Sequence, residues 1–362
     1  MKIIQILTTI AYGDAVSNDA VALADTLQRA GYETGIYAEN IDPRLPEELA
    51  GKTDSLPSLK GEDIIIYHLS TGSPLNYQIA EYPCRKLMIY HNITPFSYFE
   101  AYSYDAWKLC RSGQEGMRFL ADKVDYCLAD SEYNKADLIK AGYSCPIDVL
   151  PILIPFADYE KEPDVAVIKK YSDDRYVNIL FTGRIASNKK QEDVIRAFAL
   201  YRKLYNPRAR LFLVGSYNGM ERYCSRLKKY VRELQLENSV YFTGHISFAE
   251  ILAYYRTADV FLCMSEHEGF CVPLIEAMYF GVPVIACDSS AIGGTLNGAG
   301  VLLKEKNYLE TAGMIQYMTT HPAFRESVVK KQYERLQDLE HDKIEKQFLD
   351  YLDAFIRRRN FS

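Results

Sequence analysis

The chain has 362 residues, of which 48% are hydrophobic and 25% are charged. This length exceeds what one hydrophobic core usually serves, so two domains are expected, and no apolar run approaches the roughly 18 residues of a membrane span. The net charge of −6 is uneven, because residues 1–160 hold 13 Lys and Arg against 23 Asp and Glu, and the remainder holds 29 against 25. The more basic second half suits a phosphate-bearing ligand, although solvated faces of different composition would explain it equally well, and nucleic-acid binding gains no support.

The N-terminal run Met1–Leu7 is too short for the apolar region of a signal peptide and lacks a small-residue cleavage site. We therefore expect a strand there and a cytoplasmic protein. The eight cysteines are scattered singly, without the paired spacing of zinc sites or the density of a disulfide scaffold. They are predicted to be reduced thiols, mostly in the core.

The first 150 residues alternate short apolar runs with segments of helical period. A helix is predicted between Ser131, a suitable N-cap, and Gly142, a suitable helix end. The stretch from Pro151 to Asp164 breaks both periodicities and is predicted to be a linker. The other predicted elements are strands at residues 3–7, 34–38, 63–67, 87–90 and 126–129 and helices at residues 18–29 and 99–120.

A second alternating set follows, with helices predicted in every gap between strands at residues 178–182, 210–214, 240–243, 260–263, 283–286 and 300–302. Strands separated by helices indicate parallel sheets covered on both faces. We therefore predict an α/β fold of two doubly wound Rossmann-like domains, residues 1–160 and 161–340, facing across a cleft. The amphipathic residues 341–362 are predicted to form a helix that packs on a domain face; a membrane-surface role for the basic end, Arg357 to Arg359, is the alternative.

Ligands of open α/β sheets bind beyond the carboxyl ends of the strands, so candidate residues should follow strands directly. After the strand at 178–182 come Gly183, Arg184 and Lys189. Arg can hold phosphate oxygens in a bidentate fork and Lys adds a compact charge, so the two cations suit a diphosphate and its departure as a leaving group. Two solvated loop cations would be the simpler interpretation if this group stood alone.

A second group follows the strand at 260–263. Glu268 lies in a Gly-containing loop, and Glu276 lies eight positions later on a predicted helix. The loop could offer backbone N–H groups to hydroxyls and phosphate, and Glu276 could accept hydrogen bonds from ribose hydroxyls. The loop residues in question are Gly269, Phe270, Cys271, Val272 and Pro273.

The pair Glu268 and Glu276 matches the E-x7-E signature of retaining glycosyltransferases with two Rossmann-like domains, the GT-B class. The sequence specifically resembles family 4 of these enzymes, the glycosyl transferases of group 1. The resemblance extends in order and spacing over residues 178–303, through Gly183-Arg184 with Lys189, Leu213-Val214-Gly215, Phe242-Thr243-Gly244, Ala258 to Leu262, Glu268 to Met278, and Gly281 to Ala286.

This resemblance implies that Arg184 and Lys189 hold a donor diphosphate, that Glu276 holds the ribose, and that the backbone of residues 269–273 holds the transferred sugar and phosphate. Glu268 would lie near the donor sugar, as nucleophile or as donor-positioning group. Two positions depart from the family pattern, which often has Gly in place of Lys190 and Cys271. Cys271 adds bulk beside the donor loop and is otherwise expected to be a small buried hydrophobe.

Two further groups follow strands of the first domain. Gly13 and Asp14 lie in a turn that has a single Gly and no G-x-G-x-x-G motif, which disfavours a dinucleotide cofactor. The turn resembles that of a subset of the family, which implies that Gly13 and Asp14 face the cleft. His91, and with less support His68, follow strands directly. The family pattern implies that His91 contacts the donor sugar or the acceptor, where it could hydrogen-bond a hydroxyl without acting as a base.

No D-x-D is present, so no metal site and no required cofactor are predicted beyond the nucleotide diphosphate sugar donor, linked to GDP or UDP. The acceptor is expected to be a glycan or lipid-linked glycan, in surface polysaccharide assembly at the inner face of the membrane or in the cytoplasm. A nucleotide-sugar epimerase is one alternative. A non-catalytic sugar-nucleotide-binding subunit of an assembly complex is the other.

Overall fold

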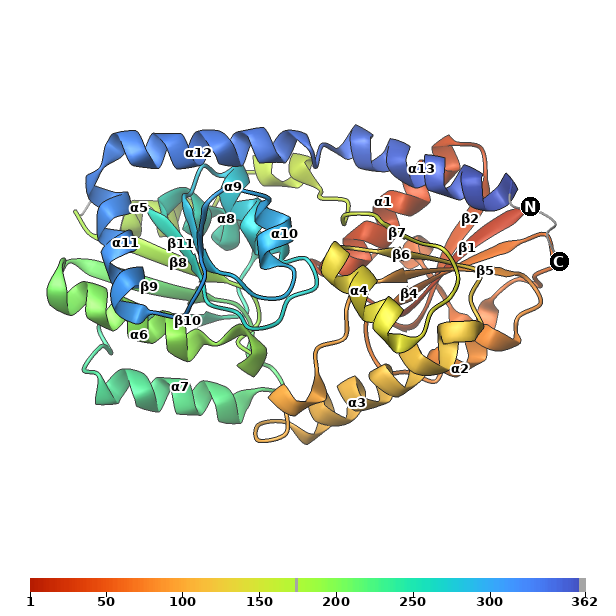
Figure 1. The fold of residues 1–362 in the computed structure, drawn as a ribbon, viewed down its shortest axis with the longest axis horizontal. Coiled ribbons are helices and arrows are strands. Elements are labelled where there is room, and N and C mark those ends of the chain that lie inside the picture. Colours follow the sequence, from red (N-terminus) through yellow and green to blue (C-terminus); the bar gives the residue numbers. More distant parts are fainter. Residues whose placement is uncertain (173–174, 358–362) are drawn as a thin grey trace. The chain divides into compact units, whose positions relative to one another are not determined.

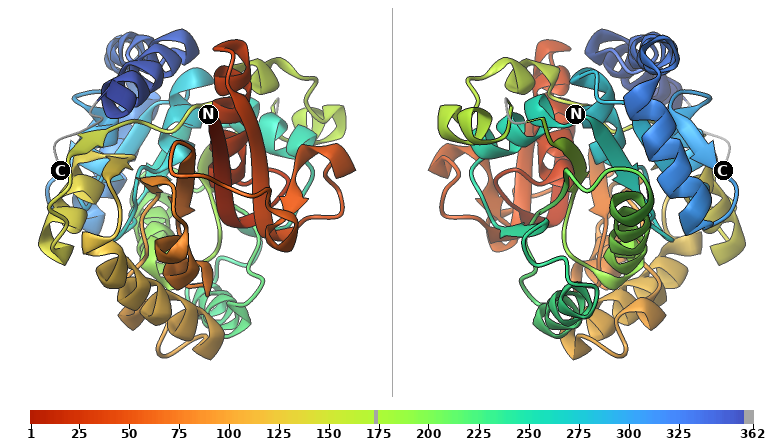
Figure 2. Two further views of the ribbon diagram at one scale, coloured as in Figure 1. Left: turned by 90° about the vertical axis from the view of Figure 1, so that its right-hand side faces the viewer. Right: turned by 90° about the vertical axis from the view of Figure 1, so that its left-hand side faces the viewer.

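The computed structural model describes residues 1–172 and 175–357, which divide into two compact units. The first unit comprises Met1–Phe96, Trp107–Phe156 and the chain from Leu339 to the end of the described residues. The second comprises Ser97–Ala106 and Ala157–Asp338. Each unit has its own parallel sheet with helices on both faces (Figures 1 and 2).

The sheet of the first unit has seven parallel strands in the order β3-β2-β1-β4-β5-β6-β7. The chain runs outward from β1 to β3 and then returns to the other side of β1, so the strand order reverses between β1 and β4. Such a reversal opens a crevice at the carboxyl ends of the two strands. The strands are β1 (Lys2–Ile10), β2 (Glu33–Ile41), β3 (Gly51–Lys52), β4 (Ile64–Leu69), β5 (Arg85–Tyr90), β6 (Tyr126–Ala129) and β7 (Ile147–Val149).

Both faces of this sheet are buried, and every residue of β4 is buried. One face packs a large cluster that includes Ile65, Tyr67 and Met88, and the other packs a smaller cluster around Leu7 and Ala38. This two-sided burial explains the continuous apolar runs of the sequence. The covering helices are α1 (Ala15–Arg29), α2 (Leu75–Gln78), α3 (Tyr104–Phe119), α4 (Glu132–Ala141) and α13 (His341–Arg357).

The sheet of the second unit has six parallel strands in the order β10-β9-β8-β11-β12-β13, and its order reverses between β8 and β11. The strands are β8 (Val177–Thr182), β9 (Ala209–Val214), β10 (Val240–Gly244), β11 (Val260–Cys263), β12 (Val284–Cys287) and β13 (Val301–Leu303). The helices are α5 (Val165–Tyr171), α6 (Gln191–Leu204), α7 (Glu221–Glu233), α8 (Phe248–Thr257), α9 (Val272–Tyr279), α10 (Ile292–Leu296), α11 (Tyr308–Thr320) and α12 (Pro322–Gln337).

Most predicted elements agree with these bounds, and the predicted caps of α4 are confirmed, since Ser131 Oγ accepts from Asn134 N and Gly142 has φ of 99°. The helix predicted from Phe99 begins only at Tyr104, because Ser103 Oγ accepts a hydrogen bond from Ala106 N and the preceding turn is irregular. The short strands β3 and β7 carry no clear period and were not predicted. Short 3-10 turns complete the chain at residues 47–49, 53–55, 79–81, 96–98, 120–122, 156–160 and 187–189.

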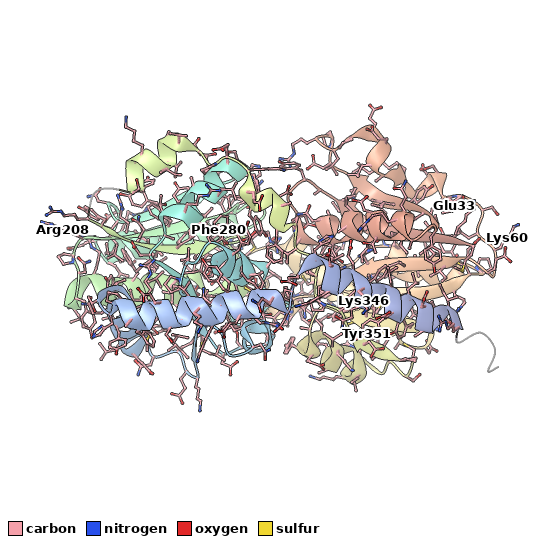
Figure 3. The ribbon with its side chains drawn as sticks, turned by 90° about the horizontal axis from the view of Figure 1, so that it is seen from above. Glu33, Lys60, Arg208, Phe280, Lys346 and Tyr351 are labelled. Atoms are coloured by element: carbon pink, nitrogen blue, oxygen red, sulfur yellow. The ribbon has the colours of Figure 1, made fainter. Side chains whose placement is uncertain are left out.

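The C-terminal helix α13 packs on the first unit. Its apolar stripe is buried at Ile344, Phe348, Leu352 and Phe355, while Lys346 and Tyr351 lie to the side of that stripe (Figure 3). The Phe355 ring stacks on Tyr126 of β6 with ring centroids 5.4 Å apart. Of the basic residues at its end, Arg358 and Arg359 lie outside the described residues. Among the described residues, no helix combines the length and the apolar character that crossing a membrane would require.

Candidate active site

The loops that follow β8 and β9 approach each other closely in the second unit. A Cβ atom added to Gly215 would lie 2.1 Å from the carbonyl oxygen of Gly183, so no other residue fits at position 215 without moving one of the loops. Gly183 itself has φ of 128°, a conformation that favours glycine. The glycines therefore let the backbone turn sharply at the carboxyl edge, where Lys189 follows.

Lys189 and Glu268 form an ion pair at this edge. Lys189 Nζ lies 2.7 Å from Glu268 Oε1 and 2.9 Å from Oε2, and the two side chains are 16% and 9% exposed. Burial disfavours the charge on Lys189, but the Glu268 carboxylate outweighs this effect and raises the pKa of Lys189 above its ordinary value. The ammonium is therefore held charged beside the Glu268 carboxylate.

Backbone and side-chain hydrogen bonds tie the loop of Lys189 to the loop of Glu268. Asn188 Nδ2 donates to the carbonyl of His267 at 3.0 Å, and Glu266 N donates to the carbonyl of Asn188 at 2.8 Å. Glu268 N donates to Ser290 Oγ at 2.8 Å. The first two bonds link the loop that carries Lys189 to the loop that carries Glu268, and the third holds Glu268 to Ser290, so the Lys189–Glu268 pair lies between two hydrogen-bonded loops.

A second charged network lies beside this surface. Lys306 Nζ contacts Asp193 Oδ2 at 2.6 Å and Glu266 Oε1 at 2.8 Å, while Lys190 Nζ lies 3.2 Å from Glu266 Oε2. Lys190 has φ of 49°, which explains why Gly is common at this position in the family that the sequence resembles. The two neighbouring lysines therefore have different partners, since Lys190 pairs with Glu266 and Lys189 pairs with Glu268.

Glu276 projects from α9 and is held by two tyrosines. Tyr255 OH donates to Glu276 Oε2 at 2.6 Å, and Tyr159 OH donates to Oε1 at 3.4 Å. Because Tyr255 donates its single proton to the carboxylate, its oxygen accepts from Thr182 Oγ1, 2.5 Å away at the end of β8. Burial raises the pKa of Glu276, and the tyrosine hydroxyls counteract part of this rise by stabilising the ionised form.

Tyr255 and Tyr159 were not among the predicted site residues. Tyr255 lies on α8, where the sequence predicted a helix but marked no site residue, and it stacks on Phe280 with ring centroids 5.2 Å apart. Tyr159 lies in the segment predicted to be a linker, where no pattern marks single residues. Only the packing of α8 against α9 brings these hydroxyls to the carboxylate.

The remaining predicted residues of the second unit differ in exposure. The Arg184 side chain is exposed, and its carbonyl accepts from Gln191 Nε2 at 3.0 Å. Cys271 is buried, with φ of 71°, directly before α9. Phe270 is also buried and accepts a hydrogen bond at its carbonyl from Thr295 Oγ1. Pro273 occupies the first turn of α9, as expected for a residue without an N–H group.

Gly13 and Asp14 are exposed in the turn between β1 and α1 of the first unit. Gly13 has φ of 74°. The Asp14 carboxylate caps α1, accepting from Ser17 N at 3.0 Å and from Ser17 Oγ at 2.8 Å. A capping role thus accounts for an acidic residue at this position, and the predicted ligand role of Asp14 stays a prediction.

His91 belongs to a buried hydrogen-bonded array that follows the order of four adjacent strands. Gln5 on β1 contacts His68 Nε2 on β4 through Oε1 at 2.8 Å, and His68 Nδ1 lies 2.8 Å from His91 Nε2. His91 Nδ1 lies 3.0 Å from Asp130 Oδ2, directly after β6. The His91 side chain is 1% exposed, and both of its ring nitrogens have protein partners.

The hydrogen-bond donors and acceptors of this array determine where its protons lie. The Ala20 carbonyl can only accept, so Gln5 Nε2, at 2.9 Å, faces it and Gln5 Oε1 accepts from His68 Nε2–H. His68 Nδ1 then accepts from His91 Nε2–H. With Nε2 of His91 protonated, the contact between His91 Nδ1 and Asp130 Oδ2 needs a further proton. The pair therefore holds one proton more than a neutral imidazole beside a carboxylate, either on His91 as an imidazolium or on Asp130 as a carboxylic acid.

The surroundings of the array agree with this assignment. Burial and the neighbouring His91 hold the pKa of His68 well below its ordinary value. Burial opposes a charge on His91, but the Asp130 carboxylate raises the pKa of His91 overall. Asp19 on α1 approaches His68 and His91, and burial raises its pKa to about 7. None of Gln5, Asp19 and Asp130 was singled out from the sequence.

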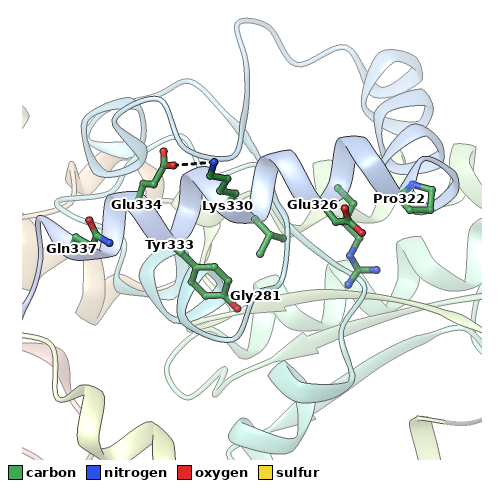
Figure 4. A pocket seen from close by; sticks show the side chains of 9 residues that line it. Gly281, Pro322, Glu326, Lys330, Tyr333, Glu334 and Gln337 are labelled. Atoms are coloured by element: carbon green, nitrogen blue, oxygen red, sulfur yellow. Dashed lines mark ion pairs between the residues drawn. The ribbon is translucent and has the colours of Figure 1, made fainter.

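The hollow along α12 is separate from these residues. It measures about 680 Å³ and is lined by Gly281, Pro322, Arg325, Glu326, Val329, Lys330, Tyr333, Glu334 and Gln337 (Figure 4). The charged side chains of its lining stand along one exposed helix, and Lys330 Nζ lies 4.0 Å from Glu334 Oε1. None of the residues predicted to carry chemistry lines this hollow, so we do not assign the site there.

Comparisons with known proteins point to the second unit. Residues 162–335 match the family described as Glycosyl transferases group 1. The chain is 36% identical over 111 residues to the mannosylfructose-phosphate synthase of Agrobacterium fabrum, and this alignment covers 30% of the chain but only 24% of that relative. It is 26% identical over 312 residues to the GDP-mannose-dependent alpha-mannosyltransferase of Mycobacterium tuberculosis, covering 76% of each protein.

The fold has counterparts among solved structures. The sucrose-phosphate synthase of Thermosynechococcus elongatus superposes with a TM-score of 0.78, over 99% of this chain and 100% of that one, at 19% identity. At this identity the likeness concerns the fold alone. The predicted class of two doubly wound Rossmann-like units is confirmed.

Proposed function

We propose that this chain, whose residues 162–335 belong to the glycosyl transferases of group 1 and whose fold is that of the GT-B glycosyltransferases, is a retaining hexosyltransferase. The donor is GDP-mannose or a UDP-hexose, and the acceptor is a glycan or lipid-linked glycan of a surface polysaccharide. GDP-mannose is the first candidate, because the relative that aligns over 76% of each protein is named as dependent on it.

The observation that carries this proposal is the Lys189–Glu268 ion pair at the carboxyl edge of the second sheet, within the residues that match the family. A largely buried ion pair costs desolvation free energy and is weak support for stability. Its presence beside a strand reversal of a doubly wound sheet, where ligands bind, favours a functional role.

Lys189 contacts Glu268 through its ammonium, which has three donor protons, so it can bind Glu268 and a phosphate oxygen together. The exposed Arg184 supplies a second cation to the diphosphate, and the backbone of residues 269–273 contacts the sugar and phosphate. Glu276, held by Tyr255, accepts from the ribose hydroxyls. Glu268 orients the donor sugar.

In the proposed reaction the bond between the anomeric carbon and the diphosphate oxygen breaks, and a bond to the acceptor oxygen forms on the same face of the sugar. The acceptor proton passes to the departing diphosphate. Lys189 and Arg184 stabilise the negative charge that develops on the leaving group, a contribution worth about 3 to 4 kcal/mol for one well-placed donor. No protein base is needed in this scheme.

The acceptor is assigned to the first unit, where Gly13, Asp14 and His91 follow strands of the sheet. Since both ring nitrogens of His91 have protein partners, we assign it a positioning role instead of direct proton transfer. Its imidazole fixes the segment from which Asn92, with φ of 81°, leaves the sheet.

A thermal-shift panel of GDP, UDP, dTDP and ADP tests the donor site. A nucleotide at 100 times its dissociation constant raises stability by about 2.7 kcal/mol. We expect one nucleotide to stabilise the wild type and to lose most of this effect with Glu276→Ala. The exposed Glu305 offers a control, because Glu305→Ala should respond like the wild type.

If no nucleotide stabilises the wild type, or if Glu276→Ala responds equally, the assignment of the donor site is wrong. If one nucleotide stabilises the wild type, the corresponding nucleotide sugar is used as donor, and transfer to an acceptor is measured by mass spectrometry. A product formed from donor alone would indicate an epimerase instead of a transferase.

EDTA should leave the transfer rate largely unchanged, because Lys189 and Arg184 supply the positive charge that a metal ion would otherwise provide. The measurement is the initial rate with and without EDTA. Loss of transfer that Mg²⁺ restores would contradict this expectation.

A further inference from the structure

Two cysteines and the Glu268 carboxylate converge at the edge of the second sheet. Cys263 Sγ, Cys271 Sγ and a carboxylate oxygen of Glu268 all lie within 4.8 Å of one another. The three residues are buried, with 0%, 7% and 8% of their surface exposed. The spacing of the cysteines in the sequence is not that of a zinc motif, so only the fold brings the three ligand atoms together.

The backbone explains the convergence. Cys263 is the last residue of β11, and the following loop leaves the sheet and returns to begin α9. Cys271 precedes α9 with φ of 71° and ψ of 63°, a left-handed conformation that is uncommon for any residue with a side chain. This conformation directs the Cys271 thiol back toward Cys263 and Glu268.

The donor set of two thiols and one carboxylate selects soft divalent cations. Thiolates bind Zn²⁺ at about 2.3 Å and are poor ligands for Mg²⁺ or Ca²⁺, and Zn²⁺ accepts four ligands in a tetrahedron. Ser265 Oγ, 3.4 Å from Cys263 Sγ, or a water could take the fourth position.

The charges balance with and without such an ion. Without the ion, the Glu268 carboxylate is neutralised by Lys189. Binding of the ion releases one proton from each thiol. The two thiolates and the carboxylate then carry three negative charges, which the divalent ion and the Lys189 ammonium together neutralise. A buried site therefore gains no net charge on binding, which avoids the large penalty of an unpaired buried charge.

We propose that Cys263, Cys271 and Glu268 form a binding site for Zn²⁺, and that the bound ion occupies the Glu268 carboxylate and inhibits sugar transfer. The inhibition rests on the function proposed for Glu268, but the metal binding does not. The ion enters from the side of Lys189, whose side chain is 16% exposed.

A second thiol pair requires a control. Cys127 Sγ and Cys145 Sγ lie 3.5 Å apart in the first unit, and no carboxylate or histidine joins them among the described groups that could hold a metal ion. Binding is therefore measured in the full chain carrying Cys127→Ala and Cys145→Ala. In this background, metal binding by two thiolates cannot come from Cys127 and Cys145.

Cd²⁺ serves as the probe, because its thiolate complexes absorb in the ultraviolet. Titration of the background chain should give one equivalent of Cd²⁺ with thiolate absorption, and Zn²⁺ should displace it. Adding Cys263→Ala should abolish this absorption. A cooperative thermal unfolding transition without added nucleotide shows whether each variant is folded. Absence of the absorption from the background chain, or its persistence with Cys263→Ala, would overturn the site.

Transfer assays test the consequence. Zn²⁺ should inhibit the wild type and Cys127→Ala alike by at least tenfold, EDTA should reverse the inhibition, and Cys263→Ala should be resistant at unchanged basal activity. If Cd²⁺ and Zn²⁺ bind as expected but transfer continues, the role proposed for Glu268 fails while the metal site stands. If Cys263→Ala is inhibited like the wild type, the metal acts elsewhere and the inference fails.

Discussion

Asp19 is the residue whose protonation should most change the stability of the first unit. Its Oδ1 accepts from Leu153 N at 2.8 Å, and it lies beside His68 and His91. Burial, supported by the Asp130 carboxylate and opposed by His91, raises the pKa of Asp19 to about 7. The side chain is therefore held largely protonated in the folded protein at mildly acid pH.

The raised pKa of Asp19 determines the direction in which the stability of the protein changes with pH. The unfolded chain loses this proton near pH 3.9 and the folded chain near pH 7, so the folded state binds more protons between these values. The free energy of unfolding then falls as pH rises, by about 1.4 kcal/mol per unit and on the order of 4 kcal/mol in all. This loss is the contribution of Asp19 alone.

Asp19→Asn should remove this loss, because the amide cannot ionise and keeps the oxygen that accepts from Leu153. We expect the variant to match the wild type near pH 4 and to exceed it in stability by pH 7, measured by urea unfolding. Asp25→Asn, an exposed change on the same helix, serves as control. Parallel pH profiles of Asp19→Asn and wild type would show that the Asp19 pKa is ordinary.

At the scale of elements, the geometry of the second unit depends on how closely the loops after β8 and β9 pass. Gly215 has φ of 149° and leaves no space for a Cβ beside the Gly183 carbonyl. Gly183 in turn lies against Lys189, since a Cβ there would be 3.7 Å from Lys189 Nζ. A displacement at Gly215 should therefore reach the Lys189–Glu268 pair.

Gly215→Ala should destabilise the protein by about 2 to 3 kcal/mol through forced overlap and should weaken nucleotide binding. Gly219→Ala is the matched control, because Gly219 also has a positive φ, of 76°, but meets nothing within 4 Å. That control should lose only about 1 to 2 kcal/mol from backbone strain and keep its nucleotide affinity. Urea unfolding and the thermal-shift panel measure both. Equal nucleotide affinity in the two variants would contradict the coupling.

At the scale of the whole molecule, the chain crosses between the units more than once. Its last helix returns to the first unit, where the Glu345 carboxylate bonds to Thr26 Oγ1 at 2.7 Å and pairs with Arg29. Arg85 Nη2 also donates to the carbonyl of Phe355 at 2.5 Å. The first unit therefore cannot complete its core until the end of the chain has been made.

Phe348→Ala should cost the first unit about 3 to 5 kcal/mol, because this ring is 0% exposed in the contact of α13 with the unit. Trp107 is the only tryptophan and belongs to the first unit, so its fluorescence reports the unfolding. Lys346 is exposed on the same helix, so Lys346→Ala should leave the unfolding transition of Trp107 fluorescence unchanged. Nucleotide binding by the second unit should persist in both variants. An unshifted Trp107 transition in Phe348→Ala would show that α13 does not stabilise this unit.

The sequence by itself determined the fold class, because alternating strands and helices of two periods leave few arrangements other than doubly wound parallel sheets. It also predicted the caps Ser131 and Gly142, since capping depends on single residues and local hydrogen bonds. The ordered motifs from Gly183 to Ala286 marked the second unit as the family-matched one, because their spacing follows directly from the strand–loop–helix repeat.

Tertiary structure alone decided which side chains meet. The partners of Glu276 come from α8 and from the segment predicted to be a linker, and the array around His91 joins four strands that are distant in the chain. Likewise, Cys263 and Cys271 converge only because a loop returns in a left-handed conformation. Local periodicity carries no information on such contacts, because they depend on strand order and helix packing, which are settled only when the whole chain has folded.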